Sequence, residues 1–166
     1  MTVAVSAYDA VKALHIMAAI SAYGLPLAYP MLLPYVRRAH PRAMPALHDV
    51  QHRLNVRLTG PGTVLLLAFG AYMAGKHDLW GEAWVEVGLG VLVAIVVLGG
   101  WIVRATERMA LLARADVTAA AAPGAATAVT WSAEYEALYR RYMAVETLLG
   151  ALVLLAVFFM AAKPFS

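Results

Sequence analysis

One imidazole lies inside the first long apolar stretch of the chain. From Ala13 to Val36 the sequence has no Asp, Glu, Lys or Arg, and His15 is the only histidine there. An ionisable side chain is costly to bury at membrane depth, so such a residue is a functional candidate. Lys12 lies about one helical turn before it, which places His15 near one surface of the membrane.

Small and aromatic residues repeat along the same side of the expected helix. Four of them follow at intervals of seven and so lie close to one line: Tyr8, His15, Ala22 and Tyr29. Ala18 and Ala19 flank this line and leave a groove into which another helix or a flat ligand could pack. In the alternative interpretation, His15 only hydrogen-bonds to a neighbouring helix, as polar residues do in membrane bundles.

A second pair of histidines lies in the polar segment that follows. His48 and His52 are four residues apart, so both imidazoles lie on one face of a helix, as in a chelating pair. The segment offers no third ligand nearby, and Leu47 and Leu54 lie opposite at helical intervals. We therefore expect an amphipathic helix from Pro45 into the next apolar stretch, with the histidines on a solvated interfacial face.

Motifs of other chemistries are missing from the sequence. There is no cysteine, which excludes disulfides, thiolate metal sites and cysteine nucleophiles. No Ser-His-Asp order, HExxH or GxGxxG pattern occurs, and Gly60-Pro61-Gly62 predicts a kink or a close helix approach rather than a phosphate loop. The eight methionines have no repeated ligand spacing, which argues against a thioether copper path. Basic residues are not interleaved with aromatics, so nucleic acid is not an expected partner.

The composition is that of an integral membrane protein. Of the 166 residues, 63% are hydrophobic and 14% are charged, and the mean hydropathy is +0.71, which is too apolar for a soluble domain. Four stretches are long enough to cross a hydrocarbon core of about 30 Å: residues 8–36, 58–74, 83–103 and 143–162. We predict an all-α fold, a single domain (1–166) that forms a bundle of four transmembrane helices, with residues 117–129 as a flexible linker.

Local signals define the ends and bends of these helices. Ser6 and Asp9 have the spacing of a capping box, and Ser132 is a candidate N-cap for the last helix. Gly24 and three prolines follow in the second half of the first stretch, and these should bend it. Three tyrosines before the fourth span share one face: Tyr135, Tyr139 and Tyr142.

Arginine and lysine are distributed unevenly between the two ends of the bundle. The first and third connections hold 10 of the 13 basic residues: Arg37, Arg38, Arg42, Arg53, Arg57, Arg104, Arg108, Arg114, Arg140 and Arg141. The other end has Lys12, Lys76 and Lys163. The positive-inside rule therefore predicts that both termini are outside and that the long connections form amphipathic helical extensions in the cytoplasm.

This topology gathers polar residues at the external end. The group comes from the first helix, the loop after the second span, the third helix and the end of the chain: Asp9, Lys12, His15, His77, Asp78, Glu82, Glu86 and Lys163. Such a group could hold a cation, a cofactor or a proton relay, or each residue could simply mark where a helix meets water. At the cytoplasmic end, Glu146 and Arg57 could pair across helices in a structural role.

Short motifs in the chain resemble known membrane families. The first helix is similar to that of the HemJ-type protoporphyrinogen oxidases in Lys12-Ala13-Leu14-His15-Ile16, Ala19-Ile20-Ser21, Gly24-Leu25 and Tyr29-Pro30, and the Lys-Pro ending is also similar. The chain resembles the CopD-like copper-resistance membrane proteins as well. Over nearly its whole length it is similar to an uncharacterised bacterial family of four-helix integral membrane proteins.

The HemJ resemblance implies a b-type haem, with His15 in place of the essential first-helix histidine. A neutral imidazole in an apolar groove can ligate haem iron, and the cofactor-binding residues would be His15, Tyr8, Lys12, Ala19 and Ala22. HemJ-type enzymes also rely on a lysine in the third helix, and residues 83–103 contain none, so the oxidase activity is not implied. Further candidates for binding a metal are His77, Glu82 and Glu86.

Three functions are compatible with these observations. The first is a haem-b-binding, redox-linked protein of the bacterial inner membrane that acts through His15. The second is a small cation- or proton-handling transporter that uses the external histidine and carboxylate cluster. The third is an accessory or assembly subunit without chemistry. The expected partners are the lipid bilayer and a second copy of the chain or a larger membrane complex.

Overall fold

The computed structural model describes residues 6–124 and 128–163, and all regular secondary structure in these ranges is helical. The first helical rod consists of α1 (Ala7–Tyr23), the short turn Pro26–Ala28 and α2 (Tyr29–Ala39). The second consists of the short turn Pro41–Ala43, α3 (Met44–Leu54), the turn Asn55–Thr59 and α4 (Gly60–Lys76). The third and fourth are α5 (Ala83–Ala120) and α6 (Ala133–Ala162). The predicted all-α fold is confirmed.

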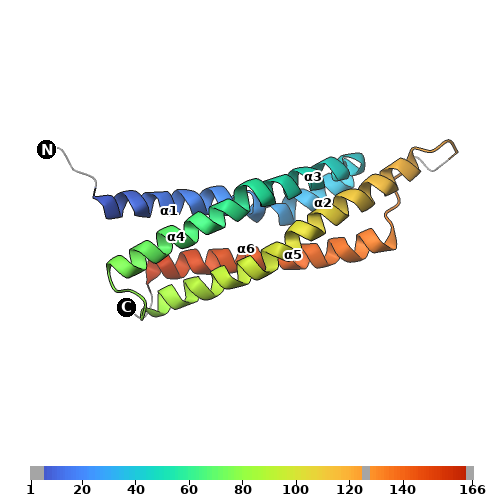
Figure 1. Ribbon diagram of the computed structural model, residues 1–166. Helices are drawn as coiled ribbons and strands as arrows, with labels where there is room; N and C mark the ends of the chain where they lie inside the picture. The colour runs from blue at the N-terminus through green and yellow to red at the C-terminus, as the bar shows by residue number, and fades with distance from the viewer. Residues whose placement is uncertain (1–5, 125–127, 164–166) are drawn as a thin grey trace.

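Four helical rods are long and apolar enough to cross a membrane: Ala7–Ala39, Pro41–Lys76, Ala83–Ala120 and Ala133–Ala162. Each contains one of the four apolar stretches predicted from the sequence. Figure 1 shows that α1 begins and α6 ends at the same end of the bundle, beside the turn between α4 and α5. The α2–α3 turn and the α5–α6 connection lie at the opposite end, with the arginine-rich segments.

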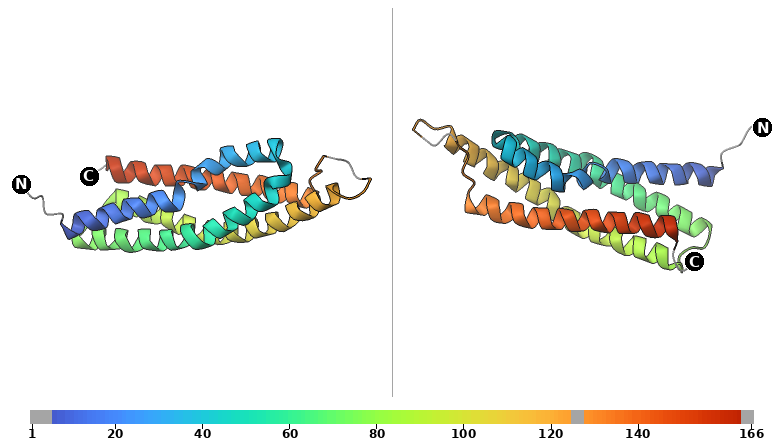
Figure 2. Two further views of the ribbon diagram at one scale, coloured as in Figure 1. Left: turned by 90° about the horizontal axis from the view of Figure 1, so that it is seen from above. Right: turned by 180° about the vertical axis from the view of Figure 1, so that it is seen from behind.

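The first rod is bent, as its glycine and prolines predicted. α1 ends at Tyr23, where the Gly24 N–H still donates to the Ile20 carbonyl at 2.9 Å. Pro26 then opens a single 3-10 turn, because proline has no N–H to continue the α-helical pattern. α2 consequently continues to one side of the line of α1 (Figure 2, left).

The second rod changes its helical pitch between its polar and apolar halves. α3 passes into α4 through a π-helical turn, Asn55–Thr59, a local irregularity that is frequent at functional sites. Gly62 follows, and a Cβ added there would lie 2.8 Å from the Ala22 Cβ. The sequence correctly predicted both the continuous amphipathic helix and the close helix approach.

The larger hydrophobic core lies in the half of the bundle that is nearer the α2–α3 turn and the α5–α6 connection. Its fully buried members come from α2, α3, α5 and α6: Leu33, Met44, Met109, Ala113, Tyr135 and Tyr142. Ser132 caps α6 by accepting from the Tyr135 N–H at 3.4 Å, and Ser6 caps α1 by accepting from the Asp9 N–H at 3.1 Å. α5 continues to Ala120, into the segment predicted as a linker, and residues 125–127 of that segment and the chain after Lys163 are outside the described ranges.

Candidate functional site

His15 lies at the contact between α1 and α4. Its Nδ1 is 3.1 Å from the carbonyl oxygen of Leu66. Because a carbonyl only accepts hydrogen bonds, Nδ1 carries the proton and Nε2 keeps its lone pair. The half-buried imidazole also lies over Gly70, where an added Cβ would be 3.3 Å from His15 Cε1.

The groove of small residues beside His15 is filled by α4. Ala22 is fully buried against Gly62, and Ala19 is half-buried. The surroundings of His15 therefore match the alternative in which it hydrogen-bonds to a neighbouring helix. A flat macrocycle does not fit between α1 and α4 in this arrangement.

The remaining residues predicted to surround a haem do not converge on His15. Tyr8 packs its ring edge-on against His77, with ring centroids 4.4 Å apart. Lys12 is exposed. At this end of the bundle Tyr8 therefore contacts the His77 ring, whereas His15 hydrogen-bonds to the Leu66 carbonyl.

The residues predicted to form an acidic cluster near the turn between α4 and α5 do not form a metal site among the described residues. His77 and Glu86 are exposed and Glu82 is half-buried. Among residues 6–124 and 128–163, no three His, Asp or Glu side chains are grouped as a metal ion requires. The amine of Lys163 lies 5.2 Å above the Trp84 ring, a cation–π contact that ties the end of α6 to α5.

The other end of the apolar region contains a cavity of about 300 Å³. It lies among α1, the Pro26–Ala28 turn, the π turn, α4, α5 and α6, and its walls are mostly apolar. Two strongly polar groups reach it, the Asn55 amide and the Glu146 carboxylate, which are 8% and 6% exposed. A largely apolar cavity with a few convergent polar groups is the usual form of a small-molecule site.

Asn55 offers the cavity an open hydrogen-bond donor. Its Nδ2 has no partner among the described residues, although buried amide groups are nearly always paired. Tyr23 and Thr63, also at the cavity wall, are by contrast hydrogen-bonded to each other. The unpaired amide is therefore a group that a bound molecule can satisfy.

Glu146 is buried among tyrosines rather than paired with arginine. It lies one helical turn after Tyr142 on α6, and both side chains are buried. Arg57 is exposed, and within the described ranges no ion pair joins it to Glu146. The predicted structural pair is wrong, because the π turn directs the Arg57 side chain outward while Asn55 points to the cavity.

A chain of buried hydrogen bonds joins α3 to α6 and ends at Tyr142. The Tyr135 hydroxyl is 3.0 Å from His48 Nε2, His48 Nδ1 is 2.8 Å from Gln51 Oε1, and Gln51 Nε2 is 3.1 Å from the Tyr142 hydroxyl. His48, Gln51, Tyr135 and Tyr142 are all fully buried. Burial lowers the pKa of His48, which lies outside the apolar stretch 58–74, to about 4.

The histidine pair of α3 is therefore not the solvated face that the sequence predicted. His48 is in the core and His52 donates from Nδ1 to the Val103 carbonyl at 3.1 Å. The reason is that α3 packs against both α5 and α6, so the face opposite Leu47 and Leu54 is covered. A signal was present in the sequence: a stripe of polar residues at helical spacing continues into the apolar stretch, through His48, Gln51, Asn55, Thr59 and Thr63.

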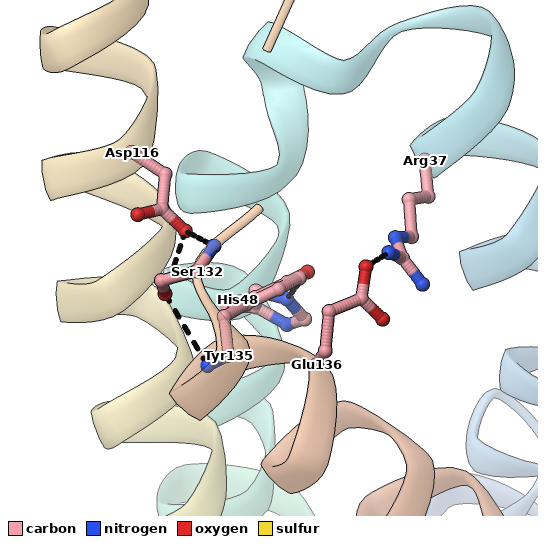
Figure 3. Close-up of polar contacts among 6 residues, drawn as sticks. All are labelled: Arg37, His48, Asp116, Ser132, Tyr135 and Glu136. Carbon is pink, nitrogen blue, oxygen red and sulfur yellow. Dashed lines mark hydrogen bonds and ion pairs between the residues drawn. The ribbon is translucent and has the colours of Figure 1, made fainter. Parts of the chain in front are cut away.

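Polar contacts fix the start of α6 against its neighbours (Figure 3). Arg37 of α2 pairs with Glu136, and its guanidinium carbon lies 4.6 Å from the Tyr139 ring centroid. Asp116 of α5 accepts from the Ser132 N–H at 2.9 Å and from its hydroxyl at 3.0 Å. These contacts hold in place the helix that carries Tyr142 and Glu146.

The structure thus brings Glu146 and Asn55 to one cavity, and the hydrogen bonds from His48 end at Tyr142, one helical turn before Glu146. His15 contacts Leu66, and Tyr8 contacts His77, at separate places. Sequence reasoning placed Glu146 at the start of the fourth span but gave it a structural role. No protein family model, no curated protein and no solved structure matches this chain.

Proposed function

We propose that this protein spans the bacterial inner membrane four times and handles lipophilic cations in exchange with protons at Glu146. Four rods of sufficient length and hydropathy support the spans. The arginine-rich segments, gathered at the end opposite the first and last helix termini, support an orientation with the extensions in the cytoplasm.

The observation that carries the proposal is the position of the Glu146 carboxylate. It is buried, it lines the cavity, and none of the described arginine or lysine side chains pairs with it. A charged carboxylate in apolar surroundings needs a counter-charge or a proton. A cation and a proton therefore compete for the same oxygen atoms, which is the basis of exchange.

The cavity walls define the rest of the ligand. They are apolar and include the exposed outer residues Leu27, Val64 and Val96, so the cavity opens sideways towards lipid. A volume of about 300 Å³ suits a molecule with one aromatic ring. The ligand class is thus a small organic cation soluble in the bilayer, and an acceptor oxygen on it would satisfy Asn55.

Binding of benzyltrimethylammonium to the purified protein in nanodiscs tests this function. Its matched control is neopentylbenzene, which has the same shape with a carbon in place of the charged nitrogen. We expect the cation to bind the wild type and to lose at least roughly tenfold in affinity with Glu146→Gln, while the neutral compound binds both equally. Glu86→Gln, at the other end of the bundle, should leave cation binding unchanged. Equal cation affinity in the wild type and Glu146→Gln would refute the proposal.

A second candidate function is haem binding at His15, favoured by one observation. The Leu66 carbonyl fixes the proton on Nδ1, and a histidine held this way presents Nε2 to a metal. Since α4 fills the groove at Ala22, a haem would have to approach the half-exposed imidazole from the lipid side of α1. A Soret band on haem addition that is lost in His15→Ala supports this function, and no band after supplementation excludes it.

A further inference from the structure

One face of α2 packs into the core of the bundle and the opposite face is open. Tyr29 and Leu33 are buried among residues of α3, α5 and α6. The residues of the open face recur at helical intervals and line a shallow groove of about 590 Å³: Pro30, Met31, Pro34, Tyr35, Arg38 and Ala39. Met31 is 82% exposed. The groove is therefore open to whatever surrounds the bundle.

This α2 groove has an apolar end and a cationic end. Two proline rings and the Met31 side chain form the apolar end, and Arg38 follows seven residues later, a helical rise of about 10 Å. Arg38 is exposed, and in the described ranges no ion pair joins it to an acidic side chain, whereas its neighbour Arg37 is paired. Tyr35 lies between the two ends, with its ring edge-on to His40 at 6.3 Å between centroids.

The direction of this polarity matches that of a phospholipid in the cytoplasmic leaflet. α2 runs from the Pro26–Ala28 turn towards the arginine-rich end of the bundle (Figure 2, left). In the proposed orientation Arg38 is therefore at headgroup level, Met31 is in the acyl layer, and Tyr35 is at the interface where tyrosine rings are typical. The cytoplasmic leaflet contains anionic lipids, and a guanidinium group binds phosphate through two parallel hydrogen bonds.

We infer that the α2 groove binds an anionic phospholipid, with the lipid phosphate on Arg38 and an acyl chain along Pro34 and Met31. The inference rests on the membrane orientation in the proposed function and does not involve Glu146. A second copy of the chain fits this face less well. Two copies inserted in the same direction are related by an axis along the membrane normal, so contact through α2 would bring two Arg38 charges together at one depth.

Native mass spectrometry of the purified protein, titrated with lipid in detergent, measures this binding directly. The probes are dioleoylphosphatidylglycerol and dioleoylphosphatidylcholine, because they share their acyl chains and differ in headgroup charge. We expect the wild type to bind the anionic lipid at least roughly fivefold more tightly, the contribution of one basic residue at an anionic surface. Arg38→Gln should lose this preference and keep its affinity for phosphatidylcholine. Arg38→Lys keeps the charge without the planar fork and should retain part of the preference.

Arg53→Gln is the matched control, since it removes an equal charge from an exposed arginine of α3 outside the groove. It should leave the lipid preference intact. An equal loss in Arg53→Gln and Arg38→Gln overturns the site, because the preference would then come from general charge attraction. Glycerophosphoglycerol is the anionic headgroup without acyl chains. If it competes as strongly as the whole lipid, Arg38 binds free phosphate esters and the lipid site is overturned.

The lipid site and the cation site can fail separately. Arg38→Gln should bind benzyltrimethylammonium like the wild type, because Arg38 is outside the cavity that Glu146 lines. A wild type that shows no lipid preference but binds the cation through Glu146 overturns the α2 groove alone. A lipid preference that depends on Arg38, beside cation binding that is unchanged in Glu146→Gln, overturns the cation site and supports the groove.

Discussion

The Nε2 atom of His48 lies 3.0 Å from the hydroxyl oxygen of Tyr135, and this contact joins α3 to the first turn of α6. Both side chains are fully buried. Because Nδ1 donates to Gln51, a proton added to Nε2 would replace an acceptor with a second donor and place a charge in an apolar core. The packing of the extensions therefore depends on a neutral imidazole at His48.

We expect the protein to lose stability as the pH falls below about 6.5, the ordinary pKa of histidine. Burial lowers the pKa of His48 in the folded chain to about 4, so between these values the unfolded chain binds a proton that the folded chain does not. The neutral His48 therefore contributes its full stability above the pKa of the unfolded chain. The free energy of unfolding falls by roughly 3 kcal/mol as the pH is lowered to the pKa of the folded chain. Thermal unfolding in detergent, followed by circular dichroism across this range, measures the effect.

His48→Gln and His40→Gln separate this effect from other titrations. The first variant removes the buried imidazole, and its unfolding temperature should depend less on pH in the acid range than that of the wild type. His40 is exposed, so its replacement should leave the wild-type pH dependence intact. An equal acid slope in all three proteins would contradict the assignment to His48.

Arg37 should contribute more to stability than its neighbour Arg38. Arg37 pairs with Glu136 and lies over the rings of Tyr139 and Trp131, whereas Arg38 is exposed. Arg37→Ala should cost about 2 kcal/mol through the lost cation–π contacts and the charge-assisted hydrogen bond. Arg38→Ala should stay within about 0.5 kcal/mol of the wild type. Chemical unfolding of both variants is the measurement, and equal losses would show that the cluster around Arg37 is not stabilising.

Local features of this chain were predictable, and the partners of its polar residues were not. Apolar runs, the caps at Ser6 and Ser132 and the bend after Gly24 depend on neighbours in sequence, so the sequence specifies them directly. The surroundings of Glu146 depend on how α2 and the π turn pack beside α6. Local sequence patterns do not specify such contacts between segments that are distant in the chain. The sequence places Arg57 and Glu146 at the same end of the bundle, which predicts that they could pair. Arg57 lies in the π turn with its side chain exposed, so the two residues do not form an ion pair.

The two histidine predictions show the same division. His15 was placed correctly on a face of small residues, and only the structure shows that α4 occupies that face. The amphipathic pattern of α3 predicts a solvated His48, on the assumption that only one face of the helix is covered. In the structure α3 is covered on two faces, by α5 and by α6. The stripe of polar residues that continues from His48 to Thr63 is the sequence feature that indicates a second buried face.

Gly62 should be intolerant of any side chain, because α1 and α4 are in contact at this residue. A Cβ there would lie 2.8 Å from the Ala22 Cβ and 3.6 Å from its Cα, and backbone cannot move aside cheaply. Gly62→Ala should therefore destabilise the protein by roughly 1–3 kcal/mol, the usual cost of overpacking. Gly90→Ala is the matched control, since nothing lies within 4 Å of an added Cβ on α5, and it should be neutral or stabilising by up to about 1 kcal/mol through helix propensity. Unfolding temperatures of the two variants decide the matter: if Gly62→Ala is as stable as Gly90→Ala, α1 and α4 do not pack through this glycine, and the contact between His15 and Leu66 loses its support.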